Sequence, residues 1–171
     1  ADKHNLPVII HDREAHGDCF ETVLRYPNVK GVFHSYSGSR EMARELTKRG
    51  WYISFSGTVT FTNAARVREA ASAVPRDRLL IETDAPYLAP HPMRGKLNHS
   101  GYLSFVLSTL AQIWNCTPEE AAEQTYQNAK TFINKGTSLI TSVGAGFALG
   151  GGFTPAGVVG GVIGAITWGG N

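Results

Sequence analysis

The sequence has little cysteine and no excess of either charge. Its 171 residues include only Cys19 and Cys116, too few for a disulfide framework, so we expect reduced thiols. The first residues show no basic and apolar leader, and we expect a cytoplasmic location. The formal net charge of +2 does not by itself indicate a nucleic-acid partner. A composition of 42% hydrophobic and 18% charged residues excludes extended disorder and predicts a domain with a core.

Charge is absent altogether from the C-terminal part of the sequence. Residues 136–171 contain no Asp, Glu, Lys or Arg, but they hold 12 of the 19 glycines. This change in composition predicts two regions. We expect a folded body over residues 1–135 and a glycine-rich tail over residues 136–171.

The tail has several interpretations. Small residues recur at spacings of four, as in packed membrane helices, and Pro155 divides the apolar stretch. The tail is similar in style to glycine-rich, membrane-active bacteriocin-like peptides. It is a membrane-inserting segment, a flexible or aggregation-prone extension, or an element that packs on the body. The first of these makes a membrane a partner and gives an alternative function, that of a non-catalytic membrane-associating protein.

The body alternates between short apolar runs and amphipathic helical patterns. Pro27, Gly50 and Pro75 stand where helices end, and Thr117 followed by Pro118 starts another helix. Near-continuous apolar strands that alternate with helices predict an α/β fold with a parallel sheet. The predicted strands are 6–11, 29–34, 51–56 and 78–84, and the predicted helices are 15–24, 39–50, 63–74, 101–114 and one that starts at 117.

Polar side chains stand at the predicted carboxyl ends of these strands. His11, His34 and Asp84 each end a strand, and such ends meet at one edge of a parallel sheet. Two imidazoles and a carboxylate suit zinc, manganese or a similar divalent ion. Each residue could instead be a polar cap on its strand. Alternation places Glu82 on the same face as Asp84, where Glu82 could also be the buried partner of a basic residue.

A short basic loop follows the last predicted strand. Arg94 and Lys96 either form a solvated turn or hold a phosphate group. The remaining histidines are expected at the solvated surface: His4, His16, His91 and His99.

Several strings in the body carry a family resemblance. They are LPVIIHDREA, GVFHSYSGS, YISFSGTVTF, LLIETDAPYLAP and PMRGKLNHS, and they occur in this order from Leu6 onward. With this spacing the chain resembles the TatD-type metal-dependent deoxyribonucleases up to about Ile133. These enzymes are amidohydrolase-like (β/α)8 TIM barrels, so the resemblance implies that residues 1–135 are the C-terminal half of such a barrel, with about four βα units.

The resemblance also implies roles for individual residues. His11 and His34 match metal-binding histidines, and Asp84 matches the aspartate that contacts the metal and orients the attacking water. Glu82 would support a ligand rather than bind the metal itself. The implied cofactor is one or two divalent ions, Mg, Mn or Zn.

The implied reaction is the hydrolysis of phosphodiester bonds in DNA, from strand ends. Arg94 and Lys96 match the family's Arg-Gly-Lys loop and would lie near the substrate phosphate. DNA is therefore the expected partner, bound through a few phosphates.

The sequence departs from the family in two respects. Four strands are present where a barrel needs eight, and no His-x-His occurs in the chain. A half barrel leaves two strand edges and an inner face open. We therefore expect either aggregation or pairing with a second copy or a complementary half. The metal site is half a site, which leaves the activity of the truncated chain open.

Overall fold

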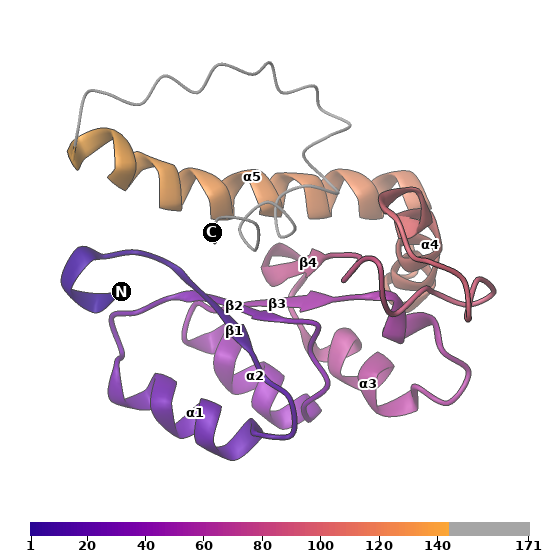
Figure 1. The fold of residues 1–171 in the computed structure, drawn as a ribbon, viewed down its shortest axis with the longest axis horizontal. Helices are drawn as coiled ribbons and strands as arrows, with labels where there is room; N and C mark the ends of the chain where they lie inside the picture. Colours follow the sequence, from indigo (N-terminus) through magenta and orange to yellow (C-terminus); the bar gives the residue numbers. More distant parts are fainter. Residues whose placement is uncertain (144–171) are drawn as a thin grey trace.

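The computed structural model describes residues 1–143, with side chains described for residues 1–134 (Figure 1). The described chain forms, in order, η1 (Asp2–His4), β1 (Val8–His11), α1 (His16–Arg25), β2 (Gly31–His34), α2 (Arg40–Lys48), β3 (Tyr52–Phe55), η2 (Gly57–Thr60), α3 (Ala65–Ala73), η3 (Arg76–Arg78), β4 (Leu79–Ile81), η4 (Ser100–Tyr102), α4 (Leu103–Trp114) and α5 (Pro118–Val143).

The four strands form one parallel sheet in the order β1-β2-β3-β4. Each strand pairs with its neighbour in the sequence, and His11 is the register partner of His34. The predicted α/β class and parallel sheet are confirmed. Both outer strands, β1 and β4, have a neighbour on one side only within the described part of the chain.

Local signals in the sequence explain where the helices begin. Ser39 precedes α2, and its hydroxyl accepts a hydrogen bond from the Met42 amide at 3.1 Å. Thr117 and Glu120 form a reciprocal capping box, with bonds of 2.9 and 3.2 Å between each amide and the other side chain. Both starts agree with the predictions.

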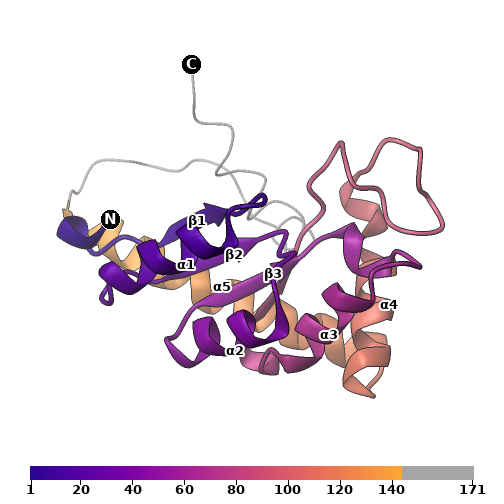
Figure 2. The same ribbon diagram turned by 90° about the horizontal axis from the view of Figure 1, so that it is seen from below.

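Helices cover the sheet on both faces. Figures 1 and 2 show α1, α2 and α3 on one face and α5 on the other. The main core lies on the side of the first three helices. There Phe33, Ile53 and Leu79 are fully buried against the helices.

The opposite face is less open than predicted. Phe132 of α5 packs against Val32, Tyr52 and Leu80, which together form a second small core. Phe132 is 6% exposed and stacks edge-on against Tyr52, with a 5.4 Å centroid distance. The expectation of an uncovered inner face is therefore wrong for this part of the sheet, because α5 folds back across it.

The last strand is shorter than predicted. β4 ends at Ile81, although the Glu82 amide still donates to the Phe55 carbonyl at 3.1 Å. Asp84 has a φ of 56°, in the left-handed region. Because strand alternation stops before Asp84, it does not place the Asp84 side chain on the face that Glu82 occupies.

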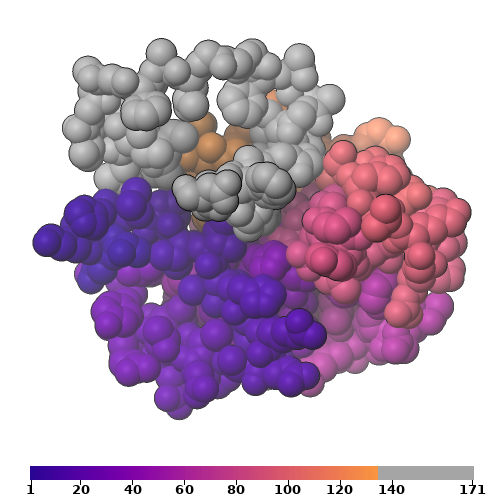
Figure 3. All heavy atoms as spheres, viewed as in Figure 1, coloured from indigo at the N-terminus to yellow at the C-terminus, as the bar shows by residue number. Residues whose placement is uncertain are grey.

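Helix α5 continues through the change in composition after residue 135 and extends to Val143, the last described residue. The rest of the glycine-rich tail lies outside the described residues, and with it the interpretations offered for residues 144–171. Within residues 1–143, no helix combines the length and the apolar character that a bilayer crossing requires. In the space-filling view, the N-terminal region and the region around α4 form opposite ends of the molecule (Figure 3).

Candidate metal centre

Two histidines meet where β1 and β2 end. His11 and His34 are the last residues of these adjacent strands and are register partners, so their side chains leave the same face of the sheet. His34 Nε2 lies 3.1 Å from His11 Nδ1, and the ring centroids are 5.2 Å apart. The sequence predicted that these two imidazoles would converge, and they do.

The spacing of the two nitrogen atoms fits a shared metal ion. Two imidazole ligands at about 2.0–2.1 Å from one zinc ion lie about 3.0–3.4 Å from each other. The 3.1 Å between His34 Nε2 and His11 Nδ1 falls in this range. Imidazole nitrogen suits zinc and other transition metals, so the pair supplies two of the ligands that such an ion needs.

Glu82 lies behind His34. Its Oε1 atom is 2.6 Å from His34 Nδ1, and its side chain is 3% exposed. Glu82 thus contacts the ring nitrogen that faces away from His11. A carboxylate in this position orients a histidine ligand. The sequence suggested a basic residue as the buried partner of Glu82, and in the structure this partner is His34.

The surroundings of His34 favour its charged form. Its contact with Glu82 raises the pKa of the imidazole above the usual value, and burial opposes this effect. The negative charges of Glu82 and Asp84 add to the increase. Asp84 therefore lies close enough for its charge to act on His34.

The structure does not assemble a complete ligand set. Within the described part of the chain, no group of three or more His, Cys, Asp or Glu side chains is arranged to hold a metal ion. His11 and His34 come together, whereas Asp84, which lies in the turn after β4, is not joined to them. The role of Asp84 as a ligand stays a prediction.

Arg94 and Lys96 lie on the exposed segment that follows β4. The Arg94 guanidinium stacks over Phe61, with its central carbon 4.2 Å from the ring centroid. Lys96 donates its amide to the Met93 carbonyl at 3.1 Å. One of the two cations is therefore held in place, and both are open to a ligand.

Asn98 organises this segment, a role that the sequence analysis did not assign. It is 6% exposed, and its side-chain amide donates to the carbonyls of Thr83 and Tyr87 at 2.5 and 2.8 Å. Its backbone amide donates to the Pro86 carbonyl at 3.0 Å. Asn98 thus closes the segment that starts beside Asp84. The sequence around Asn98 does not predict this role, because the partners of Asn98 are backbone groups.

The other histidines differ only partly from expectation. His16 was expected to be solvated, but its Nδ1 lies 2.7 Å from the buried carboxylate of Asp12. His99 is exposed and lies against Tyr102, with ring centroids 3.9 Å apart. His4 and His91 are exposed, as predicted.

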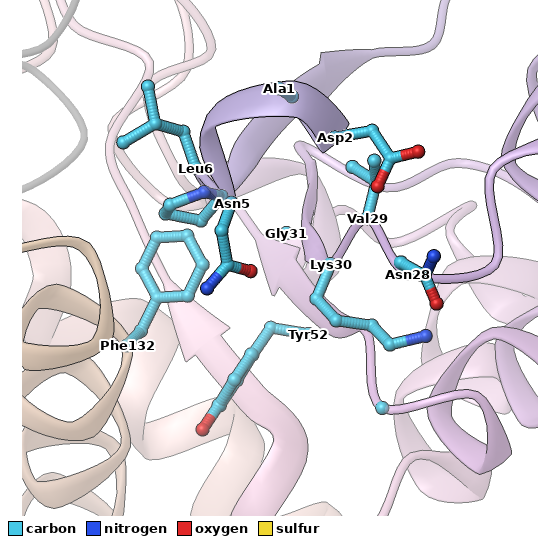
Figure 4. A pocket seen from close by; sticks show the side chains of 12 residues that line it. Ala1, Asp2, Asn5, Leu6, Asn28, Val29, Lys30, Gly31, Tyr52 and Phe132 are labelled. Atoms are coloured by element: carbon cyan, nitrogen blue, oxygen red, sulfur yellow. The ribbon is translucent and has the colours of Figure 1, made fainter. Parts of the chain in front are cut away.

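A cavity of about 380 Å³ lies at the other end of the sheet (Figure 4). Its lining includes Leu6, Lys30, Tyr52 and Phe132, near the amino ends of the strands. Because His11 and His34 stand at the carboxyl ends, this cavity is separate from the histidine pair.

The described chain is an α/β protein whose parallel sheet carries two histidines at its carboxyl edge. The chain belongs to the TatD related DNase family, whose model matches residues 1–134. This agrees with the resemblance noted in the sequence.

Individual relatives show the same relationship. The chain is 46% identical over 129 residues to the uncharacterized metal-dependent hydrolase YabD of Bacillus subtilis, covering 74% of this chain and 50% of the relative. It is 43% identical over 142 residues to the uncharacterized metal-dependent hydrolase YcfH of Escherichia coli K12, covering 81% and 53%. The chain therefore spans about half the length of the curated relatives it matches.

Solved structures agree on the fold. The crystal structure of YjjV, a TatD homolog from Escherichia coli K12, superposes with a TM-score of 0.71 at 28% identity, covering 77% of this chain and 51% of that one. A TatD family hydrolase from Entamoeba histolytica gives a TM-score of 0.65 at 19% identity, covering 75% and 50%, which is a likeness of fold alone.

Proposed function

We propose that this chain carries one half of the metal centre of a hydrolase that cleaves phosphodiester bonds in DNA from strand ends. The observation that carries the proposal is the His11–His34 pair at the carboxyl edge of the sheet, with Glu82 behind it. Family membership and the names of the curated relatives support a metal-dependent hydrolase.

In this proposal the divalent ion, Mg, Mn or Zn, is held by His11, His34 and Asp84. When bound, such an ion lowers the pKa of water from about 15.7 to about 7 and so supplies hydroxide near neutral pH. Asp84 then accepts or directs the proton of the attacking water. His34 contributes Nε2, because its Nδ1 faces Glu82.

Arg94 and Lys96 bind the phosphate in this proposal. Both are exposed cations on the segment that begins at Asp84, and charge-assisted hydrogen bonds to phosphate are among the stronger ones in proteins. Stacking on Phe61 restricts the Arg94 side chain, so it loses less conformational freedom when it binds a phosphate.

The chain needs further ligands to complete this site. We propose that a second copy or a complementary half supplies them, pairing with the outer strands β1 and β4. Two facts support this: the chain spans about half the length of its curated relatives, and the described residues hold no three-ligand cluster.

A nuclease assay tests the proposal. The full chain is incubated with an end-labelled DNA oligonucleotide, alone and with a separately produced fragment of the Bacillus relative that covers the part this chain does not match. Cleavage that requires Mn²⁺, Mg²⁺ or Zn²⁺, stops with a chelator and falls at least about 100-fold in Asp84→Asn is the expected result.

The matched control is Asp77→Asn, a change in an exposed carboxylate of η3, which precedes the amino end of β4 and so lies at the opposite end of that strand from Asp84. Its cleavage rate should equal that of the unaltered chain. Absence of metal-dependent cleavage in both the single and the mixed samples would contradict the proposed activity.

A further inference from the structure

Four polar side chains form a line across the sheet: the two histidines and, behind them, Glu82 and Ser54. The Ser54 hydroxyl of β3 donates to Glu82 Oε2 at 2.7 Å. Glu82 Oε1 contacts His34 Nδ1 at 2.6 Å, and His34 Nε2 faces His11 at 3.1 Å. Ser54 is the end of this line, and no role has been assigned to it.

Ser54 and Glu82 are buried together. Ser54 is 0% exposed and Glu82 is 5% exposed. The only ion pair recorded for Glu82 in the described part of the chain is with His34. Oε2 accepts a hydrogen bond from the Ser54 hydroxyl, and Oε1 makes an ion-pair contact with the His34 ring. Since buried carboxylates depend strongly on such partners, Ser54 determines how Glu82 is oriented.

The orientation of Glu82 determines which nitrogen of His34 carries the proton. Glu82 Oε1 lies 2.6 Å from His34 Nδ1, at an angle outside hydrogen-bond geometry. An ionised carboxylate has only lone pairs to offer, so a carboxylate this close favours an N–H at Nδ1 over a second lone pair. That leaves the Nε2 lone pair of neutral His34 directed toward His11. This is the tautomer that a metal ion at the histidine pair requires.

We propose that Ser54 is a positioning residue: by holding Glu82, it keeps His34 in the Nδ1–H tautomer and so prepares Nε2 to bind a divalent metal ion. The inference rests on the proposed function in one respect, that His34 is a metal ligand. The tautomer itself does not depend on the metal.

Ser56 provides a matched control. It is also 0% exposed and lies two residues further along the chain, directly after β3. Its hydroxyl bonds to Ser35 at 2.8 Å and to Thr58 at 3.2 Å, and not to Glu82. Each serine-to-alanine change removes a buried hydroxyl and its hydrogen bonds, but only the Ser54 change removes a bond to Glu82.

The test compares Ser54→Ala with Ser56→Ala in the full chain. Long-range ¹H–¹⁵N NMR of the histidine rings, at a pH where His34 is neutral, reports which nitrogen carries the proton. We expect the Nδ1–H tautomer of His34 in the unaltered chain and in Ser56→Ala. In Ser54→Ala we expect a mixture that includes the Nε2–H form. Ser54→Thr, which keeps the hydroxyl, should restore the original spectrum.

Zinc binding is measured calorimetrically on the same samples. Loss of a residue that orients a metal ligand typically weakens metal affinity about 10–100-fold, and we expect this loss for Ser54→Ala alone. Unfolding curves should show a larger loss of stability for Ser54→Ala, because a buried carboxylate oxygen loses its donor, and a smaller loss for Ser56→Ala. The tautomer readout separates positioning from a purely structural effect.

An Nδ1–H tautomer that is unchanged in Ser54→Ala would overturn the inference, whatever the zinc result. If instead the tautomer shifts as expected but the unaltered chain binds no zinc, the positioning role stands and the proposed metal site fails. The two ideas therefore fail in different measurements.

Discussion

His34 is the residue on which the electrostatics of the candidate site converge. Its ring contacts His11 on one side and Glu82 on the other, and Asp84 adds to the negative potential around it. Glu82 raises the pKa of His34 even though burial of the ring acts in the opposite direction. His34 therefore binds a proton more tightly than a free histidine does, and a metal ion at the proposed site would compete with that proton.

The raised pKa of His34 predicts how stability depends on pH. The folded chain holds this proton more tightly than the unfolded chain, whose histidine pKa is about 6.5. The contribution of protonated His34 to the free energy of unfolding is therefore fully present below about pH 6.5. It is lost as the pH rises through the raised pKa of folded His34.

Glu82→Gln should remove most of this dependence, since the glutamine carries no charge. Urea unfolding in the presence of a chelator, repeated over the neutral and mildly alkaline range, measures it. Unaltered protein should lose stability with rising pH more steeply than Glu82→Gln. Parallel profiles for the two proteins would contradict the account of His34.

Arg94 and Lys96 make a separate prediction about DNA. Each phosphate contact contributes about 0.7–0.9 to the slope of log affinity against log salt concentration. If both cations bind phosphate, Arg94→Ala combined with Lys96→Ala should lower the slope by about 1.4–1.8 for an oligonucleotide, measured by fluorescence anisotropy. Arg44→Ala, a change in an exposed residue of α2, should leave it unchanged. If the double variant has the same salt slope as the unaltered chain, Arg94 and Lys96 do not bind phosphate.

Among the elements, α5 distinguishes this molecule from a bare half barrel. The Asn128 side chain, 4% exposed, donates to the carbonyls of Arg76 and Leu79 at 2.6 and 2.8 Å. One turn further along, Phe132 fills the face of the sheet that the other helices leave open. The helix is therefore fixed by a polar and an apolar contact to the same part of the sheet.

Phe132→Ala should lower the free energy of unfolding by about 3–5 kcal/mol, because truncation of a buried phenylalanine loses its transfer energy and leaves a cavity. Thr131→Ala is the matched control: its side chain is exposed and bonds only to the Gln127 carbonyl of the same helix. It should change stability by less than about 0.5 kcal/mol. Similar small losses in both variants, measured by urea unfolding, would show that α5 does not pack on the sheet.

The sequence predicted the elements well because their signals are local. The Ser39 cap, the Thr117 capping box and the apolar runs each act within a few residues. The meeting of His11 and His34 was also predictable, since adjacent parallel strands end at one edge. The Ser54–Glu82 bond was not, because it depends on the register between β3 and β4. Nor does amphipathic periodicity reveal which face of the sheet a helix covers, so the position of α5 was missed.

At the scale of the whole molecule, the sheet has two edge strands and the proposed metal centre has two imidazoles close together. Both β1 and β4 have a free edge within the described residues. If a complementary half pairs with β1 and β4, the same step closes both strand edges and completes the ligand set. This links assembly to metal binding: the proposal expects the assembled form to bind metal more tightly than the single chain.

Zinc titration calorimetry on the full chain shows whether His11 and His34 form a metal-binding pair. We expect zinc binding that weakens at least about 10-fold in both His11→Ala and His34→Ala. We expect no change in His99→Ala, which removes an exposed histidine outside the pair. Zinc affinity that is the same in His34→Ala as in the unaltered chain would contradict a metal-binding pair.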